Sequence, residues 1–427
     1  EDFADVCNQL KFRFSYGELG NMNTNGWYPT YRAMTLKQAN GSWLQNGLKP
    51  NTAYVGDLIS TALTWEKVRT WNIGLDWGLF NNRLTGSFDA YIRYTDNMVG
   101  PSVELPATLG IATPKTNNCD LKTKGWELTI GWQDRTNFGM GYGIKFNVSD
   151  ARTYIDRYPG NPTNSINTYI AGREIGEIWG FETVGIAKTD DEMQAHLNKV
   201  GGQSAIGSGV WTAGDIMYAD QDGKPGITKG AQTLEDHGDL KVIGNNTPRY
   251  HFGLDLNANY KGFDVRLFFQ GDYWQGSNIF WGVGQWGMWW STGLKEHEDY
   301  FRDEPVGLAG HEIAANVNSY YARPRFDSTQ NQETQTRYLQ DASYIRLKNF
   351  QLGYTLPASM IRKIGITNCR IFVSGENLWT GTKLSKLFDP ETISGGNTDS
   401  NASAPIKSAG NAYPLSRTWS FGLSVSL

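Results

Sequence analysis

The chain has 427 residues, and its 39 lysines and arginines against 43 aspartates and glutamates give a formal net charge of −4. This balance excludes a nucleic-acid binder that depends on electrostatic attraction, so no nucleic-acid partner is expected. The three cysteines, Cys7, Cys119 and Cys369, are too few and too far apart for a disulfide scaffold or a zinc cluster.

Alternating apolar and polar residues recur along the chain and predict about ten to twelve β-strands. Aromatic residues make up 13% of the chain and there are 49 glycines, a composition typical of strands and turns. The clearest runs cover residues 10–16, 71–77, 84–94, 126–132, 140–148, 250–260, 263–269, 343–354, 370–378 and 418–427, with weaker runs near 177–187 and 211–218. No stretch approaches 18 consecutive apolar residues, whereas a membrane barrel strand needs only about ten alternating ones.

Two architectures explain this alternation, a soluble β-sandwich and a transmembrane β-barrel. The barrel is favoured because charged residues such as Lys145 and Arg266 lie well inside the polar faces, as a hydrated lumen allows. Aromatic residues such as Trp126 and Trp132 lie towards the strand ends, as interfacial girdles do.

The connections between strands are very unequal in length. Residues 260–263 predict a tight turn, while long inserts are expected near 188–248, 272–342 and 379–415. From residue 249 onward, short and long connections alternate, which places the inserts on the extracellular side. Short helices are expected at 189–201 and 291–305, and an irregular loop at 382–414.

Several stretches, in this order and spacing, carry a family resemblance. They are "LKFRFSYGELGN" (10–21), "TWEKVRTWNIGLDWGLFNNRLTGSFDAYIRYTDNM" (64–98), "TKGWELTIGW" (123–132), "IGEIWGFETVGI" (175–186), "GDIMYADQDG" (214–223), "VIGNNTPRYHFGLDLNANYKGFDVRLFFQG" (242–271), "ASYIRLKNFQLGYTLP" (342–357) and "IFVSGENLWTGTK" (371–383). Together they resemble the C-terminal part of SusC-type, RagA-like TonB-dependent outer-membrane transporters of the Bacteroidetes.

The resemblance implies the second half of a 22-stranded antiparallel transmembrane barrel in the outer membrane, here residues 1–427. The plug domain, the TonB-contacting segment and the first half of the barrel are expected to lie outside this sequence. The implied function is active import of glycan oligosaccharides, or in some relatives peptides, driven through TonB. The implied partners are a SusD-type surface lipoprotein that acts as a lid, the rest of the barrel with its plug, and the lipid bilayer.

A tryptophan-rich segment is the candidate substrate-binding site. It contains Trp274, Trp281, Trp286, Trp289 and Trp290, and sugar rings stack on flat aromatic side chains. A girdle at the outer membrane interface is the competing interpretation. Trp211, Trp379 and Tyr413 are weaker candidates of the same kind.

The segment "GDIMYADQDGKPG" begins like a calcium loop, with Asp220 and Asp222 at positions one and three. Lys224 and Pro225 then occupy positions where a calcium loop has an oxygen ligand and glycine. A Ca²⁺ or Mg²⁺ site is weighed here against a plain aspartate-rich turn, and the expectation is that the chain holds no cofactor.

No catalytic constellation stands out, since the histidines have no metalloprotease spacing and no nucleophile elbow follows a strand. The chain is therefore expected not to be an enzyme. The alternatives to the transporter are a lectin-like extracellular carbohydrate-binding protein and a secreted glycoside hydrolase with a carboxylate pair.

Overall fold

A computed structural model describes most of the chain. It covers residues 6–22, 30–38, 44–56, 58–101, 113–207, 210–273, 295–325, 330–393 and 413–426, with the single residues 106, 108 and 110. No helix among them is long and apolar enough to cross a membrane.

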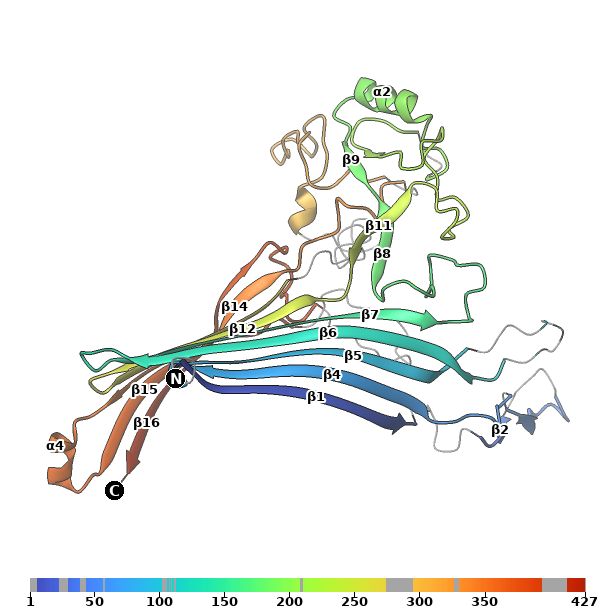
Figure 1. Cartoon of the computed structure of the whole chain (residues 1–427). Helices are drawn as coiled ribbons and strands as arrows, with labels where there is room; N and C mark the ends of the chain where they lie inside the picture. The colour runs from blue at the N-terminus through green and yellow to red at the C-terminus, as the bar shows by residue number, and fades with distance from the viewer. Residues whose placement is uncertain are drawn as a thin grey trace.

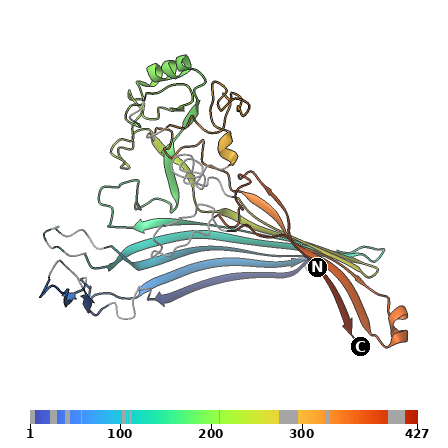
Figure 2. The same ribbon diagram turned by 180° about the vertical axis from the view of Figure 1, so that it is seen from behind.

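The main feature is one antiparallel sheet of ten strands in the order β1-β4-β5-β6-β7-β12-β13-β14-β15-β16 (Figure 1). The strands are β1 (Cys7–Asn21), β4 (Glu66–Leu79), β5 (Leu84–Gly100), β6 (Thr116–Arg135), β7 (Gly141–Arg157), β12 (Arg249–Tyr260), β13 (Phe263–Tyr273), β14 (Tyr344–Thr355), β15 (Asn368–Thr382) and β16 (Thr418–Ser426). The sheet is strongly curved, and in Figure 2 β15 and β16 run at a steep angle to β1 and β4.

The register gives this sheet one apolar and one polar face, because partners in neighbouring strands point to the same side. One row of partners runs through Phe12, Leu75, Phe88, Leu128 and Val148. Phe12 is 77% exposed and Phe88 38% exposed. A soluble monomer rarely leaves so continuous an apolar surface uncovered, and the alternation therefore favours a barrel wall. We call this side the apolar face.

The opposite side, the polar face, carries arginine–aspartate pairs between strands. Arg13 of β1 donates to both carboxylate oxygens of Asp76 on β4 and of Asp89 on β5, at 2.7–2.8 Å. Arg370 of β15 likewise donates to Asp264 of β13, across the intervening strand β14. Lys145 and Arg266, the charges expected on a hydrated surface, lie on this same face, and Arg266 donates to Asp255 of β12.

All short connections lie at one end of the strands. They are residues 80–83, 136–140, 261–262 and 356–367, the last of which contains the short helices α4 (Ala358–Ile361) and η4 (Arg362–Ile364). Lys261 and Gly262 both have positive φ, 48° and 88°, as the tightest hairpin turns require. The long connections lie at the other end, and one of them carries the hairpin of β2 (Met34–Gln38) and β3 (Asn51–Val55).

Glycines let aromatic rings lie flat across neighbouring strands. A Cβ on Gly86 would lie 2.2 Å from the indole of its cross-strand partner Trp77, and one on Gly422 would lie 2.1 Å from the ring of Phe372. Such ring-over-glycine pairs fill the gap that the missing side chain leaves. They account for part of the high glycine and aromatic content.

The described parts of the connections β7–β12, β13–β14 and β15–β16 pack into a compact body, the insert unit, which rises from the β7–β12 side of the sheet (Figure 1). It contains two two-stranded ribbons, β8 (Glu177–Phe181) with β11 (Leu240–Asn245), and β9 (Thr183–Ile186) with β10 (Ile216–Tyr218). The weak runs near 177–187 and 211–218 thus form strands, as expected, but these strands pair in the two ribbons and not in the ten-stranded sheet. They pair inside one connection because their side chains build a separate core.

The helices follow the sequence only in part. The expected helix at 189–201 is confirmed as α2 (Asp190–Val200), capped by the Thr189 hydroxyl and ended by Gly201 at φ 77°. The expected helix at 291–305 is wrong for its described part, which has only one short 3-10 helix, η3 (Lys295–Glu298). Backbone pairing of Tyr300 with Tyr321 and of Arg302 with Asn316 replaces the helix.

Candidate functional site

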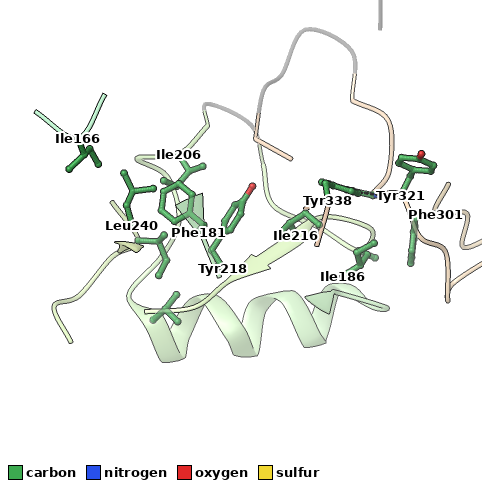
Figure 3. Packing of buried hydrophobic residues seen from close by; sticks show 14 of the residues in the cluster. Ile166, Phe181, Ile186, Ile206, Ile216, Tyr218, Leu240, Phe301, Tyr321 and Tyr338 are labelled. Carbon is green, nitrogen blue, oxygen red and sulfur yellow. Dashed lines mark hydrogen bonds between the residues drawn. The ribbon is translucent and has the colours of Figure 1, made fainter. Parts of the chain in front are cut away.

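The insert unit has a buried core of aromatic and branched side chains. Phe181, Tyr218 and Tyr338 have no exposed surface, and Phe301 is 1% exposed. Figure 3 shows Phe181 beside Tyr218, at 5.0 Å between ring centroids, and Tyr321 beside Tyr338. This core joins the first insert, between β7 and β12, to the second insert, between β13 and β14.

A buried polar network reinforces that joint. The carboxylate of Asp215, which has no exposed surface, accepts hydrogen bonds from Arg325 at 2.5 and 2.8 Å and from Asn331 at 2.9 Å. Asn331 also accepts from the backbone N–H of Ile216 at 2.9 Å. Buried charges that are fully hydrogen-bonded in this way rigidify a structure, so the surfaces that the insert unit carries are held firmly.

The candidate substrate site is a cleft of 720 Å³ where the second and third inserts meet, the tyrosine cleft. It is lined by Lys295, Glu298, Asp299, Arg302, Ile313, Asn316, Tyr320, Tyr321, Gln340, Lys383 and Ser385. Its size suits a small ligand or a segment of an oligomer.

The polar walls of the tyrosine cleft are preorganised. Asp299 accepts hydrogen bonds from the Asn316 amide at 2.7 Å and from the backbone N–H of Tyr320 at 3.2 Å. Gln340 accepts from the backbone N–H of Ser385 at 2.9 Å, which ties the second insert to the third. These hydrogen bonds orient the Asp299 and Gln340 side chains before a ligand enters.

Other side chains of the cleft stay accessible. Lys295, Glu298 and Lys383 are exposed and form no salt bridge with any residue that the structure describes. Tyr320, by contrast, is half-buried, and its hydroxyl donates a hydrogen bond to the backbone carbonyl of Arg337 at 3.2 Å. The two amines and the carboxylate, beside the amides of the cleft wall, can hydrogen-bond to a hydroxyl-rich ligand.

A buried charge cluster holds the third insert in place beside the cleft. Arg346 of β14 pairs with Asp389 at 2.7 Å and with Glu391 at 3.0 Å, and Lys348 pairs with Glu391 at 2.8 Å. Burial alone raises the pKa of the Asp389 carboxyl, but hydrogen bonds from Arg346 and from two backbone N–H groups leave its pKa below the ordinary value. The cluster therefore fixes residues 383–391 against the sheet at neutral pH.

A second cavity, of 620 Å³, lies where the insert unit joins β7 and β12. Its lining includes Arg152, Glu174, Tyr250 and Tyr273. Tyr273 pairs in register with Arg249, and Arg152 pairs in register with Lys124. Both pairs lie in rows that continue the apolar face. This cavity opens towards that face, so it is a weaker candidate for a transported ligand than the tyrosine cleft.

The predicted tryptophan site falls outside the described residues. Trp274, Trp281, Trp286, Trp289 and Trp290 all belong to the range 274–294, which directly precedes Lys295 of the tyrosine cleft. Their role as sugar-contacting residues stays a prediction. Of the weaker candidates, Trp379 and Tyr413 are 50% and 87% exposed, whereas Trp211 packs against the insert core.

The predicted aspartates of the calcium-like loop lie together, and the structure adds Asp239. One carboxylate oxygen from each of Asp220, Asp222 and Asp239 lies within 4.8 Å of the others. Every one of these carboxylates already accepts a backbone N–H, and Asp239 accepts two, from Gln221 and Thr228. Lys224 also pairs with Asp222 at 3.2 Å. The geometry is that of an aspartate-stabilised turn.

Comparison with known protein families and proteins gives a consistent result. The family profile described as "TonB dependent receptor-like, beta-barrel" matches residues 5–378. TonB-dependent receptor P3 of Formosa agariphila is 28% identical over 440 residues, which cover 100% of the chain and 40% of that relative. TonB-dependent receptor SusC of Bacteroides thetaiotaomicron is 23% identical over 439 residues, 99% of the chain and 38% of that relative.

Solved structures agree at the level of the fold. The structure of the RagAB peptide transporter superposes with a TM-score of 0.66 at 21% identity, covering 99% of the chain and 41% of that protein. The RagAB peptide importer in its "open-open" state gives the same score. The chain spans about 40% of the length of the relatives it matches.

Proposed function

The chain belongs to the TonB-dependent receptor-like β-barrel family of the bacterial outer membrane, and on that premise we propose that it forms part of the wall of an active importer. The match over residues 5–378 carries this proposal. The two faces of the sheet support it, since an exposed apolar face suits lipid and a face with arginine–aspartate pairs suits a wet lumen.

We propose that the complete protein closes this sheet into a barrel. Among the residues that the structure describes, strands β1 and β16 each have one neighbour in the sheet, so each presents an unpaired edge. Exposed edges invite association and a closed barrel removes them. The partners that we expect are strands from the rest of the protein, together with a plug and a TonB-contacting segment.

The proposed cargo is an oligosaccharide that is passed on by a SusD-type surface lipoprotein. The tyrosine cleft supports this choice because it combines tyrosine rings with amide, amine and carboxylate groups, which suit hydroxyl-rich rings. The tryptophans of the segment that precedes Lys295 in the sequence are proposed to add flat surfaces on which sugar rings stack. No catalytic role is proposed, and the matched relatives are named as receptors and transporters.

The test uses the full-length protein with its lipoprotein, isolated together from native outer membranes. The complex is titrated with a glycan panel and with peptides, and uptake of the ligand that binds is measured in cells with and without TonB. We expect glycan binding and TonB-dependent uptake. A Lys295→Ala and Lys383→Ala double variant should bind less tightly, whereas Lys145→Ala on the polar face of β7 should match the wild type.

The possible failures are distinguishable. Binding of peptides alone would overturn the glycan proposal and leave the importer intact. Glycan binding without uptake would favour the lectin-like alternative. A protein that stays soluble and monomeric without detergent would overturn the membrane barrel itself.

A further inference from the structure

The apolar face ends in a sharp boundary on strands β4 to β7. Its last wholly apolar row is Phe12, Leu75, Phe88, Leu128 and Val148. The next row towards the long connections contains Trp126 and the one after it contains Trp71. Tryptophans at such a boundary are typical of the level at which hydrocarbon gives way to lipid headgroups.

Three cations lie immediately beyond Trp126 on the same face. Lys124 is the register partner of Arg152, and Lys122 is the partner of Tyr154 one row further out. Partners share a face, and alternate residues of a strand return to it, so Lys122, Lys124 and Arg152 form one group, the basic trio. The rows are about 7 Å apart along a strand.

The chain neutralises the two lysines of this group poorly, since neither Lys122 nor Lys124 forms a salt bridge with any residue in the described part of the chain. Arg152 forms a long ion pair with Glu174 at 3.8 Å, and Asp150, one row away on the same face, is itself paired with Arg249. By contrast, Arg69 on the same face donates to Asp96 at 2.7 Å. Like charges directly opposite each other on neighbouring strands destabilise a sheet, so a further anion between Lys124 and Arg152 would stabilise the pair.

Tyrosines hold the lysines along the surface of the sheet. The Lys122 amine lies 5.2 Å from the centre of the Tyr94 ring, and the Lys124 amine 5.9 Å from the centre of the Tyr154 ring. These cation–π contacts stabilise the lysines without consuming their charge. Each amine therefore keeps its capacity to bind an anion.

From this arrangement we propose that the basic trio binds the phosphate of a membrane-lipid headgroup against the outer side of the barrel wall. The position identifies the occupant, because a lipid whose chains cover Phe88 and Leu128 brings its headgroup to the level of Lys124 and Arg152. The charge is complementary, since amines and a guanidinium bind phosphate oxygens strongly. Bound lipid would also relieve the repulsion between the two opposed cations.

The experiment compares lipid retention by the full-length transporter and by a Lys122→Gln, Lys124→Gln, Arg152→Gln variant. The matched control is Lys11→Gln, Arg93→Gln, Lys145→Gln, which removes the same charge from the polar face of the same sheet. Native mass spectrometry counts the lipids that co-purify, and titration in detergent with phosphorylated lipid A measures affinity. Each cation near an anionic surface strengthens binding about fivefold, so the trio variant should bind about 100-fold more weakly than the control.

Two further probes separate the sources of phosphate. Lipid A from which the phosphates have been removed should bind the wild type as weakly as phosphorylated lipid A binds the trio variant. Inorganic phosphate at millimolar concentration should not displace the lipid. Equal lipid retention by the trio variant and the control would overturn the proposal. So would equal binding of phosphorylated and dephosphorylated lipid A, or displacement by inorganic phosphate alone.

Both variants must be folded for the comparison to hold. An unheated barrel migrates differently from a heated one on a gel, and each variant should keep that difference. The trio variant could lose this difference in migration while the control keeps it. In that case, phosphorylated lipid A added during refolding of the wild type should raise the yield of folded barrel, and dephosphorylated lipid A should not. No difference between the two lipids in that assay would also overturn the proposal.

Discussion

The guanidinium of Arg346 on β14 donates a hydrogen bond of 2.7 Å to the carboxylate of Asp389 in the third insert, and both residues are less than 10% exposed. The two lie 43 positions apart in the chain. The pair therefore connects the wall of the sheet to a loop that lines the tyrosine cleft.

Replacing Arg346 by alanine should release this loop. The change leaves Asp389 buried without its cation, and breaking a buried pair in this way costs about 3–5 kcal/mol. We expect faster hydrogen exchange at residues 383–393 while the strands keep their protection. Lys67→Ala, which removes the exposed pair with Glu18, is the control and should change nothing measurable. Unchanged exchange at 383–393 in the Arg346 variant would contradict the role assigned to the pair.

The same pair should make the loop sensitive to acid. The pKa of Asp389 is lowered in the folded protein, so its contribution is fully present above the carboxyl's ordinary pKa and is lost as pH falls through the folded value. Protease sensitivity of residues 383–393 should therefore rise below about pH 4. An Asp389→Asn variant should show sensitivity already at neutral pH, with a flatter pH dependence. A steep acid transition that persists in this variant would assign the effect to another group.

On the polar face, Arg13 should not be replaceable by lysine. Its guanidinium makes four hydrogen bonds to Asp76 and Asp89 and so links three strands. A lysine amine cannot reproduce two bidentate contacts. Arg13→Lys should lower the temperature at which the barrel unfolds on a gel by roughly 2–4 °C, and Lys11→Ala on the same strand should leave it unchanged. Equal behaviour of both variants would mean that the pairs contribute little.

The sequence predicted the sheet better than the site, for a physical reason. Strands that separate two environments must alternate strictly, so runs such as 126–132 could be assigned from the sequence alone. Contacts in the insert unit depend on which loops meet in space, and no local pattern encodes the pairing of Gln340 with Ser385.

The third aspartate beside Asp220 and Asp222 was missed for the same reason, since Asp239 lies outside the loop motif. The basic trio did leave a signal, because Lys122 and Lys124 continue the alternation that contains Trp126.

The aspartate loop is expected to hold no Ca²⁺. The Lys224 amine pairs with Asp222, so a positive charge already lies beside this carboxylate. Hydrogen bonds from Lys224, first from its backbone N–H, keep the pKa of Asp222 below the ordinary value. Addition of millimolar Ca²⁺ should leave hydrogen exchange at residues 218–240 unchanged. A Lys224→Asp variant would supply the missing oxygen ligand and is expected to gain Ca²⁺ affinity. Protection of these residues by Ca²⁺ in the wild type would show that the loop is a metal site after all.

The tryptophan segment can be tested against a tryptophan that faces lipid. If Trp286 and Trp289 stack on sugar rings, replacing either by alanine should weaken glycan binding about tenfold, which corresponds to roughly 1.4 kcal/mol. Trp419 is 56% exposed on the apolar face of β16, with its ring 6.2 Å from that of Phe350, so Trp419→Ala should leave glycan affinity unchanged. The reverse holds if the segment is an interfacial girdle. The Trp286 and Trp289 variants would then bind glycan normally and would insert less efficiently into liposomes, as we expect of Trp419→Ala. Titration calorimetry with the glycan and the yield of folded barrel in liposomes together decide between the two.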